Sequence, residues 1–179
     1  MTLYRSVSAG PQGPARTFGV SLGHLQLAEA DHWILGLDPR PELACTHLVS
    51  EPYRHVAISL TAGLAASSSA SVGGAETAPE LHAAAEAAVA GKFGRAVLFP
   101  GVEKLVGTLT AGEIVELSAI DRVEVLGSGV ADDDARVDTR EFVRPQFRDG
   151  ELVLTTTPAA GGVLVPFETR DPTPCCANH

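Results

Sequence analysis

Apolar and polar residues alternate along much of this chain, which is the pattern of β-strands that bury one face. The first alternating segment covers residues 17–27, in which Phe18, Val20 and Leu22 are separated by small or polar residues. A second strand is predicted over residues 28–38, where apolar side chains again recur at alternate positions. It ends at the proline-rich turn that follows, because proline cannot continue a ladder of backbone hydrogen bonds.

Strand patterns continue after this turn and dominate the second half of the chain. Residues 42–49 are ambiguous, and residues 130–138 are rich in charge and are predicted to form a loop. Further strands are predicted at residues 55–60, 95–101, 105–118, 121–127, 141–147, 151–157 and 163–168. Asp149-Gly150 suits the positive φ values of a type I′ turn, so it predicts a β-hairpin between the strands on either side.

One segment has a helical rather than a strand period, and it predicts an α-helix near residues 78–90. Thr77 precedes it, and Glu80 three residues later completes a Thr-x-x-Glu capping box. Gly91 follows it, in the position where glycine commonly ends a helix. Its apolar stripe consists of Leu81, Ala84, Ala85, Ala88 and Val89.

These patterns predict a β-rich α+β fold with roughly eight to ten strands and one amphipathic helix. We expect a single domain over residues 1–179, since a chain of this length buries enough surface for one core. Residues 1–16 are rich in Pro and Gly and are predicted to form an irregular arm. Residues 65–76 are rich in Ser, Ala and Gly and predict a loop, with a boundary between two small domains as the alternative.

Composition and charge narrow the classes of protein to which this chain belongs. With 45% hydrophobic residues the chain is too apolar to be disordered as a whole, and no stretch approaches the ~18 uncharged apolar residues of a membrane-spanning helix. The formal net charge of −9 repels phosphate backbones, which argues against nucleic acid as a partner. The N-terminal segment lacks the apolar core of a signal peptide, so we expect a cytoplasmic protein with reduced thiols.

Cysteine and histidine residues form the first candidate site. The chain ends in a Cys-Cys-x-x-His group, and a Cys-x-His pair lies far from it in the sequence. Thiolate and imidazole are the ligands that transition metals such as zinc prefer, and structural zinc takes about four of them. If the fold brings the two groups together, the candidate metal ligands are Cys45, His47, Cys175, Cys176 and His179. Thiols that only pack the tail, or a reactive thiol of lowered pKa, are the alternatives.

Arginine residues form the second candidate site. Arg140, Arg144 and Arg148 recur at every fourth position. Because Pro145 and the neighbouring aromatic residues argue against a helix, a strand is predicted here. On a strand, even spacing places the three guanidinium groups on one face, where they could hold the phosphate or carboxylate of a small metabolite. A solvated strand face balanced by nearby acidic residues is the alternative.

The sequence therefore leaves two functions open. In the first, the protein is a small binding protein that holds a transition metal or acts through reactive thiols at its Cys-Cys-x-x-His group. In the second, it is an enzyme or binding domain for a small anionic metabolite at the arginine face. The sequence contains no phosphate-binding loop, nucleophile elbow or common zinc-hydrolase signature, so neither a reaction nor a substrate follows from it.

Overall fold

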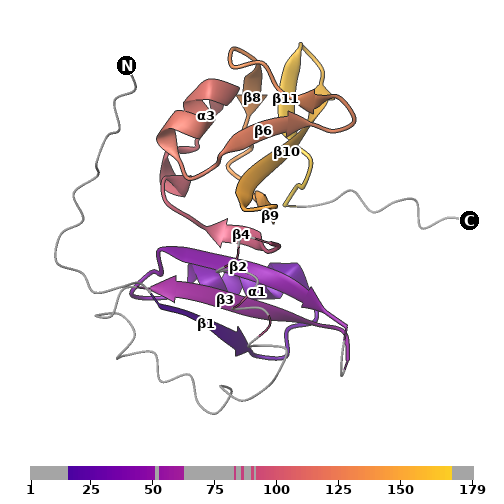
Figure 1. Cartoon of the computed structure of the whole chain (residues 1–179). Helices are drawn as coiled ribbons and strands as arrows, with labels where there is room; N and C mark the ends of the chain where they lie inside the picture. The colour runs from indigo at the N-terminus through magenta and orange to yellow at the C-terminus, as the bar shows by residue number, and fades with distance from the viewer. Residues whose placement is uncertain are drawn as a thin grey trace, which may run out of the picture.

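The computed structural model describes residues 16–50, 53–62, 83, 86, 90 and 92–170 (Figure 1). These residues form an 11-stranded mixed sheet with two α-helices, which confirms the β-rich α+β fold. In chain order the elements are β1 (Arg16–Ser21), α1 (Leu27–Leu35), β2 (Leu43–Val49), β3 (His55–Ala62), β4 (Arg95–Leu98), the 3-10 helix η1 (Val102–Lys104), β5 (Thr108–Thr110), α3 (Ala111–Leu117), β6 (Arg122–Val125), β7 (Gly129–Val130), β8 (Arg136–Asp138), β9 (Gln146–Arg148), β10 (Glu151–Ala159) and β11 (Val163–Pro166). No helix in these ranges has the length and apolar character needed to cross a membrane.

The strands are hydrogen-bonded in the order β1-β3-β2-β4-β9-β10-β11-β8-β5, and β6 pairs with β10 and with β7. One end of the molecule holds β1, β2, β3 and α1, and the other end holds α3, β6, β8, β10 and β11 (Figure 1). β4 lies between them, because it pairs with β2 along one edge and, at Arg95, with Gln146 of β9 on the other. The two ends are therefore joined through β4, close to Arg95.

Among the described residues, the buried apolar side chains form two hydrophobic cores, and β2 contributes to both of them. At the first end, α1 contributes Ile34, which is buried in one cluster with Val20 of β1 and Ile58 of β3. At the other end, Ile114 of α3 is buried in one cluster with Leu154 of β10. Full burial of such a side chain contributes about 1.5–3 kcal/mol. The two cores hold α1 and β10 in place, and these elements line one cleft from opposite sides.

The strand predicted over residues 28–38 is wrong, because α1 forms there. The buried residues of this helix are Ala30, Asp31 and Ile34. That spacing belongs to one face of a helix rather than to alternate positions of a strand. The start of α1 is supported by Glu29, whose carboxylate accepts the backbone N–H of Gln26 at 3.4 Å. In this segment the burial of one helix face against the sheet therefore determines the structure, and the local alternation of apolar residues does not.

The strand predicted over residues 105–118 is correct only in its first half, where β5 lies, because α3 follows at once. A capping box starts this helix. The Thr110 hydroxyl accepts the Glu113 N–H at 3.2 Å, and the Glu113 carboxylate accepts the Thr110 N–H at 2.7 Å. This is the same Thr-x-x-Glu signal that predicts the helix near residues 78–90, so the start of α3 is also marked in the sequence.

The predicted helix near residues 78–90, the arm at residues 1–16 and the loop at residues 65–76 lie largely outside the described residues. Of the helix, the structure describes Ala83, Glu86 and Ala90. The first two are helical, and Ala90 donates its backbone N–H to the carbonyl of Glu86 at 2.9 Å. Of the arm, only its last residue is described, at the start of β1. The rest of these three segments and the number of domains stay predictions.

Strands also form where the sequence pattern is weak. β2 occupies the ambiguous residues 42–49, and β8 lies within residues 130–138, where a loop is predicted. β2 is paired on both edges, with β3 and β4. Four consecutive residues of β2 are buried, namely Ala44, Cys45, Thr46 and His47. A strand covered on both faces has no reason to alternate apolar and polar residues, which explains the weak signal.

The predicted β-hairpin at Asp149-Gly150 is confirmed. β9 and β10 pair in antiparallel fashion across it, with Arg148 opposite Glu151. The φ angles of Asp149 and Gly150 are 52° and 91°, positive at both positions as a type I′ turn requires. The first strand of the hairpin is shorter than predicted, because β9 covers only the end of residues 141–147.

Two glycines with positive φ should differ in how much stability the protein loses when each is replaced by alanine. Gly101 and Gly150 have φ of 84° and 91°. Gly150→Ala should lower the free energy of unfolding by about 1–2 kcal/mol, since a Cβ there meets no atom within 4 Å and only the left-handed backbone is strained. Gly101→Ala should lower it by more, because its Cβ would lie 2.1 Å from the Leu117 carbonyl oxygen. Urea denaturation measures both losses, and equal losses would contradict the contact with Leu117.

Candidate functional site

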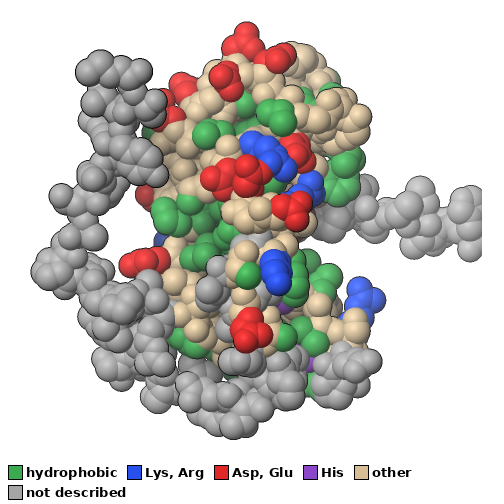
Figure 2. All heavy atoms as spheres, in the orientation of Figure 1, with side chains coloured by type: hydrophobic (Ala, Val, Ile, Leu, Met, Phe, Trp, Pro, Cys, Tyr) green, Lys and Arg blue, Asp and Glu red, His purple; other side chains and the backbone are tan. Residues whose placement is uncertain are grey.

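A cleft with a volume of about 940 Å³ lies between α1 and the strands β9 and β10. Its charged lining residues are Asp31, Arg95, Arg144, Arg148, Glu168 and Arg170. Its large apolar lining residues are Leu27, Leu35, Leu126, Phe142, Val153 and Phe167. On the face drawn in Figure 2, basic side chains near the middle of the molecule have acidic side chains beside them.

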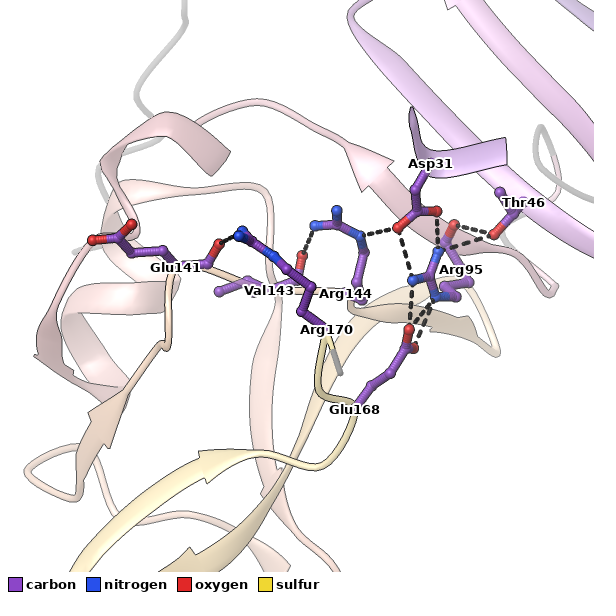
Figure 3. Close-up of polar contacts among 8 residues, drawn as sticks. All are labelled: Asp31, Thr46, Arg95, Glu141, Val143, Arg144, Glu168 and Arg170. Atoms are coloured by element: carbon purple, nitrogen blue, oxygen red, sulfur yellow. Dashed lines mark hydrogen bonds and ion pairs between the residues drawn. The ribbon is translucent and has the colours of Figure 1, made fainter. Parts of the chain in front are cut away.

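Arg95, the first residue of β4, is the centre of an ion-pair cluster in this cleft (Figure 3). Its guanidinium group donates to both carboxylate oxygens of Asp31, at 2.6 and 3.0 Å. It also donates to Glu168 through Nε and Nη2, and to the Thr46 hydroxyl at 3.3 Å. All five N–H donors of a guanidinium are thereby used. Burial alone would lower the pKa of Arg95, but the hydrogen bonds to Glu168 and Asp31 outweigh it and raise that pKa. Arg95 is therefore a saturated, structural cation.

Arg144 lies beside this cluster and is only partly saturated. Its Nε donates to Asp31 at 2.9 Å and its Nη1 donates to the Val143 carbonyl at 3.0 Å. Its guanidinium carbon lies 4.3 Å from the centroid of the Phe142 ring. Two of its five N–H donors are thus used, and the other three have no hydrogen bond in the part of the chain that the structure describes. The side chain is only 8% exposed, and burial lowers its pKa, which Asp31 opposes.

Arg148 and Arg170 complete the basic lining of the cleft. Arg148 donates to the Glu124 carboxylate and to the Thr155 hydroxyl, each at 3.0 Å. Arg170 donates to the backbone carbonyl of Glu141 at 3.3 Å, and no described carboxylate pairs with it. Both arginines are exposed, so their side chains are less restrained than that of Arg144.

The prediction that Arg140, Arg144 and Arg148 share one face of a strand is wrong. Arg140 and the residue after it have φ of 54° and 50°, and this left-handed turn ends any extended run. The Arg140 side chain is 60% exposed and pairs with Asp138 at 3.0 Å. Of the three predicted residues, only Arg148 lies in a strand, at the end of β9. The structure brings Arg144 and Arg148 to the same cleft and leaves Arg140 on the surface away from it.

Sequence reasoning missed Asp31, Arg95 and Glu168, which organise the cleft. Arg95 is 64 positions from Asp31 and 73 positions from Glu168, so no short motif joins them. A usable signal exists in two places. Asp31 interrupts the buried face of α1, and Arg95 opens a strand in which all four residues are buried. A charge at a buried position requires a partner of opposite charge, which would have suggested this pair.

Cys45 and His47, two of the predicted metal ligands, lie two positions apart on β2 and therefore on one face of it. Burial raises the pKa of the Cys45 thiol to about 12, although a hydrogen bond with Ser59 acts in the opposite direction. The Nε2 atom of His47 bonds to the Ser59 hydroxyl at 2.8 Å, and burial lowers the pKa of His47 to about 4. Its Nδ1 atom is buried with no hydrogen-bond partner among the described residues. Both side chains are therefore neutral at pH 7.

The other predicted ligands, Cys175, Cys176 and His179, lie outside the described residues, as does the expected approach of the tail to Cys45. Within the described ranges, no group of three or more His, Cys, Asp or Glu side chains is placed to hold a metal ion. A transition metal binds the thiolate, and burial opposes the loss of the Cys45 proton. The metal site, with zinc as the expected ion, stays a prediction.

The depressed pKa of His47 predicts a specific loss of stability in acid. The pKa is about 4 in the folded protein against 6.5 in the unfolded chain, so the unfolded chain takes up the proton first as the pH falls. This contribution is complete above pH 6.5 and is lost between pH 6.5 and about 4, up to about 3 kcal/mol. His47→Gln should remove it. Urea denaturation across this pH range compares the two proteins, and parallel pH profiles would show that another group titrates.

The buried and exposed aspartates that pair with arginine should differ strongly in their importance. Asp31→Asn removes the negative charge between Arg95 and Arg144, which leaves two poorly compensated cations and should cost about 3–5 kcal/mol. Asp138→Asn is the matched control, because the pair with Arg140 is exposed and is worth about 0–1 kcal/mol. Chemical denaturation at neutral pH measures both free energies. A loss below 1 kcal/mol for Asp31→Asn would contradict the role assigned to this carboxylate.

No protein-family model, curated protein or solved structure matches this chain. The function is therefore argued from the geometry and electrostatics of the cleft.

Proposed function

We propose that the cleft binds a small organic anion. The observation that carries the proposal is Arg144, whose nearly enclosed guanidinium is fixed by Asp31 and Phe142 and keeps three N–H donors unclaimed at the wall of the cleft. A carboxylate or phosphate group accepts two such donors side by side. Hydrogen bonds to charged groups contribute about 1.5–3 kcal/mol each, more than neutral ones.

The electrostatics of Arg144 support an anion over a neutral ligand. Among the described residues its ion-pair partner is the carboxylate of Asp31, and Arg95 donates to both oxygens of the same carboxylate. Burial lowers the pKa of Arg144 and the shared carboxylate raises it, and the effect of burial is the larger one. A bound anion would give Arg144 a second acceptor of negative charge beside the carboxylate that it shares with Arg95, whereas a neutral ligand would leave the guanidinium as it is.

The rigidity of Arg144 supports the same proposal. The bonds to Asp31 and Val143 and the contact with the Phe142 ring hold the guanidinium plane in one orientation. An arginine on an open surface loses side-chain entropy when it binds a ligand. Arg144 has already lost that freedom in the folded protein, so a larger share of the interaction energy appears as affinity.

The cleft is better suited to binding than to proton transfer. Both carboxylates that line it, Asp31 and Glu168, accept hydrogen bonds from guanidinium groups, so their oxygens are already engaged within the protein. No observation on the described residues favours the alternative function through a transition metal or a reactive thiol, because burial keeps Cys45 protonated. We therefore propose a binding protein.

Replacement of Arg144 should abolish most of the affinity for anions. Calorimetric titration of the full chain with octanoate, benzoate and inorganic phosphate should detect binding of at least one of them. Arg144→Gln should weaken that binding by roughly tenfold or more, the equivalent of one charge-assisted hydrogen bond. Arg140→Gln is the matched control, since this side chain lies outside the cleft, and it should bind as the unaltered protein does.

Two results would overturn the proposal. The first is the absence of binding of all three anions to the unaltered protein. The second is equal affinity of all three proteins for the anion that binds, with the fold of Arg144→Gln verified by circular dichroism.

A further inference from the structure

The charges and the apolar walls of the cleft narrow the class of ligand. Resting on the proposed anion binding, we infer that the ligand is a monocarboxylate with an apolar acyl body, whose carboxylate lies on Arg144 and whose body lies against Leu126 and Phe167. Two independent features of the cleft lead to this class, namely its charge balance and the exposure of its apolar side chains.

The charge balance of the cleft favours a single negative charge. Three of its four arginines belong to ion pairs with three carboxylates. The pairs are Asp31 with Arg95 and Arg144, Glu168 with Arg95, and Glu124 with Arg148. Glu124 also pairs with Arg122, whose charge is balanced by a second carboxylate, that of Glu151. Arg170 is left over, with the backbone carbonyl of Glu141 as its acceptor in the described part of the chain. One negative charge on the ligand restores neutrality, whereas a phosphate monoester or a dicarboxylate would place a surplus negative charge beside Asp31 and Glu168.

Apolar side chains at the cleft are exposed without a ligand. Leu126 and Phe167 are 54% and 58% exposed. Both are held by the backbone at β10, where Leu126 donates its N–H to the Thr156 carbonyl at 2.8 Å and Phe167 donates to the Thr155 carbonyl at 2.9 Å. Leu35 of α1 is 43% exposed on the opposite side of the cleft. Large apolar side chains that gather around a cavity mark a surface that becomes covered on binding.

The size of the cleft favours a ligand that is larger than its anionic group. Its volume of about 940 Å³ lies near the upper end of small-molecule sites, roughly 300–1,000 Å³. Acetate or inorganic phosphate would occupy the donors of Arg144 and leave the apolar walls in water. An acyl chain attached to the carboxylate covers those walls and removes apolar surface from water on both partners.

Calorimetry with a matched series of ligands on the full chain tests the inference. Acetate and octanoate share a carboxylate and differ in the acyl body, and octanoate should bind roughly tenfold tighter or better, since each buried methylene adds affinity. Octanol shares the chain and lacks the charge, and suberate carries a second carboxylate where octanoate has a methyl group. Both should bind at least tenfold more weakly than octanoate.

Variants at exposed positions test the contributions of the acyl body and of the carboxylate to the affinity separately, and such positions can be changed without disturbing the fold. Phe167→Ser should weaken octanoate binding severalfold and leave the binding of acetate unchanged, because it alters only the apolar wall. Phe93→Ser is the matched control, as this ring is 53% exposed and lies outside the cleft. Arg170→Gln should weaken octanoate binding severalfold and leave octanol unaffected, because it removes the uncompensated charge.

The outcomes distinguish this inference from the proposal on which it rests. Equal binding of acetate, suberate and octanoate would overturn the acyl class and leave anion binding standing. Unchanged octanoate affinity in Phe167→Ser and in Arg170→Gln would also overturn the inference. No binding of any acid, or unchanged binding in Arg144→Gln, would overturn both.

Discussion

The carboxylate of Asp31 is the constraint on which the cleft depends. It accepts hydrogen bonds from Arg95 at the start of β4 and from Arg144 just before β9, and Glu168 beyond β11 joins the same cluster through Arg95. One carboxylate on α1 therefore connects segments from both ends of the molecule. Apolar packing has no preferred direction, so it could join the ends but could not orient the guanidinium planes, which bidentate ion pairs do.

A cluster of buried charges is a poor source of stability, and this points to positioning as its role. Taking each ion out of water costs several kcal/mol, and apolar residues of similar volume often serve stability equally well. The two arginines of the cluster divide the roles. Arg95 uses every donor on Asp31, Glu168 and Thr46, whereas Arg144 uses two donors and keeps three. Arg95 holds the shared carboxylate of Asp31 in place, and this carboxylate in turn orients Arg144, which keeps N–H donors available for a ligand.

Local sequence patterns predicted much of the sheet and little of the cleft. The Asp149-Gly150 hairpin followed from the backbone conformation that these residues favour, and β3, β6 and β10 followed from alternation. α1 and α3 have nine and seven residues, so a helical period repeats only about twice and competes with alternation. The four-residue spacing of the arginines singled out Arg144 and Arg148, but for a wrong reason. It assumed that they share one face of a strand with Arg140, and the left-handed turn at Arg140 rules out such a strand. The ion pairs of Asp31 and Glu168 join residues 64 to 113 positions apart, which no local pattern encodes.

The cleft and the whole chain have opposite charge, and this contrast decides which anions can approach. The net charge of −9 and an exposed acidic run such as Asp132, Asp133 and Asp134 repel extended polyanions over the Debye length, about 8–10 Å at physiological salt. Arg144 acts only over hydrogen-bonding distance, because its side chain is nearly enclosed and its charge is partly balanced by Asp31. An anion that reaches it must concentrate its charge on a small group. It must also gain its remaining affinity from contacts that the acidic surface does not oppose, and in this cleft those contacts are apolar.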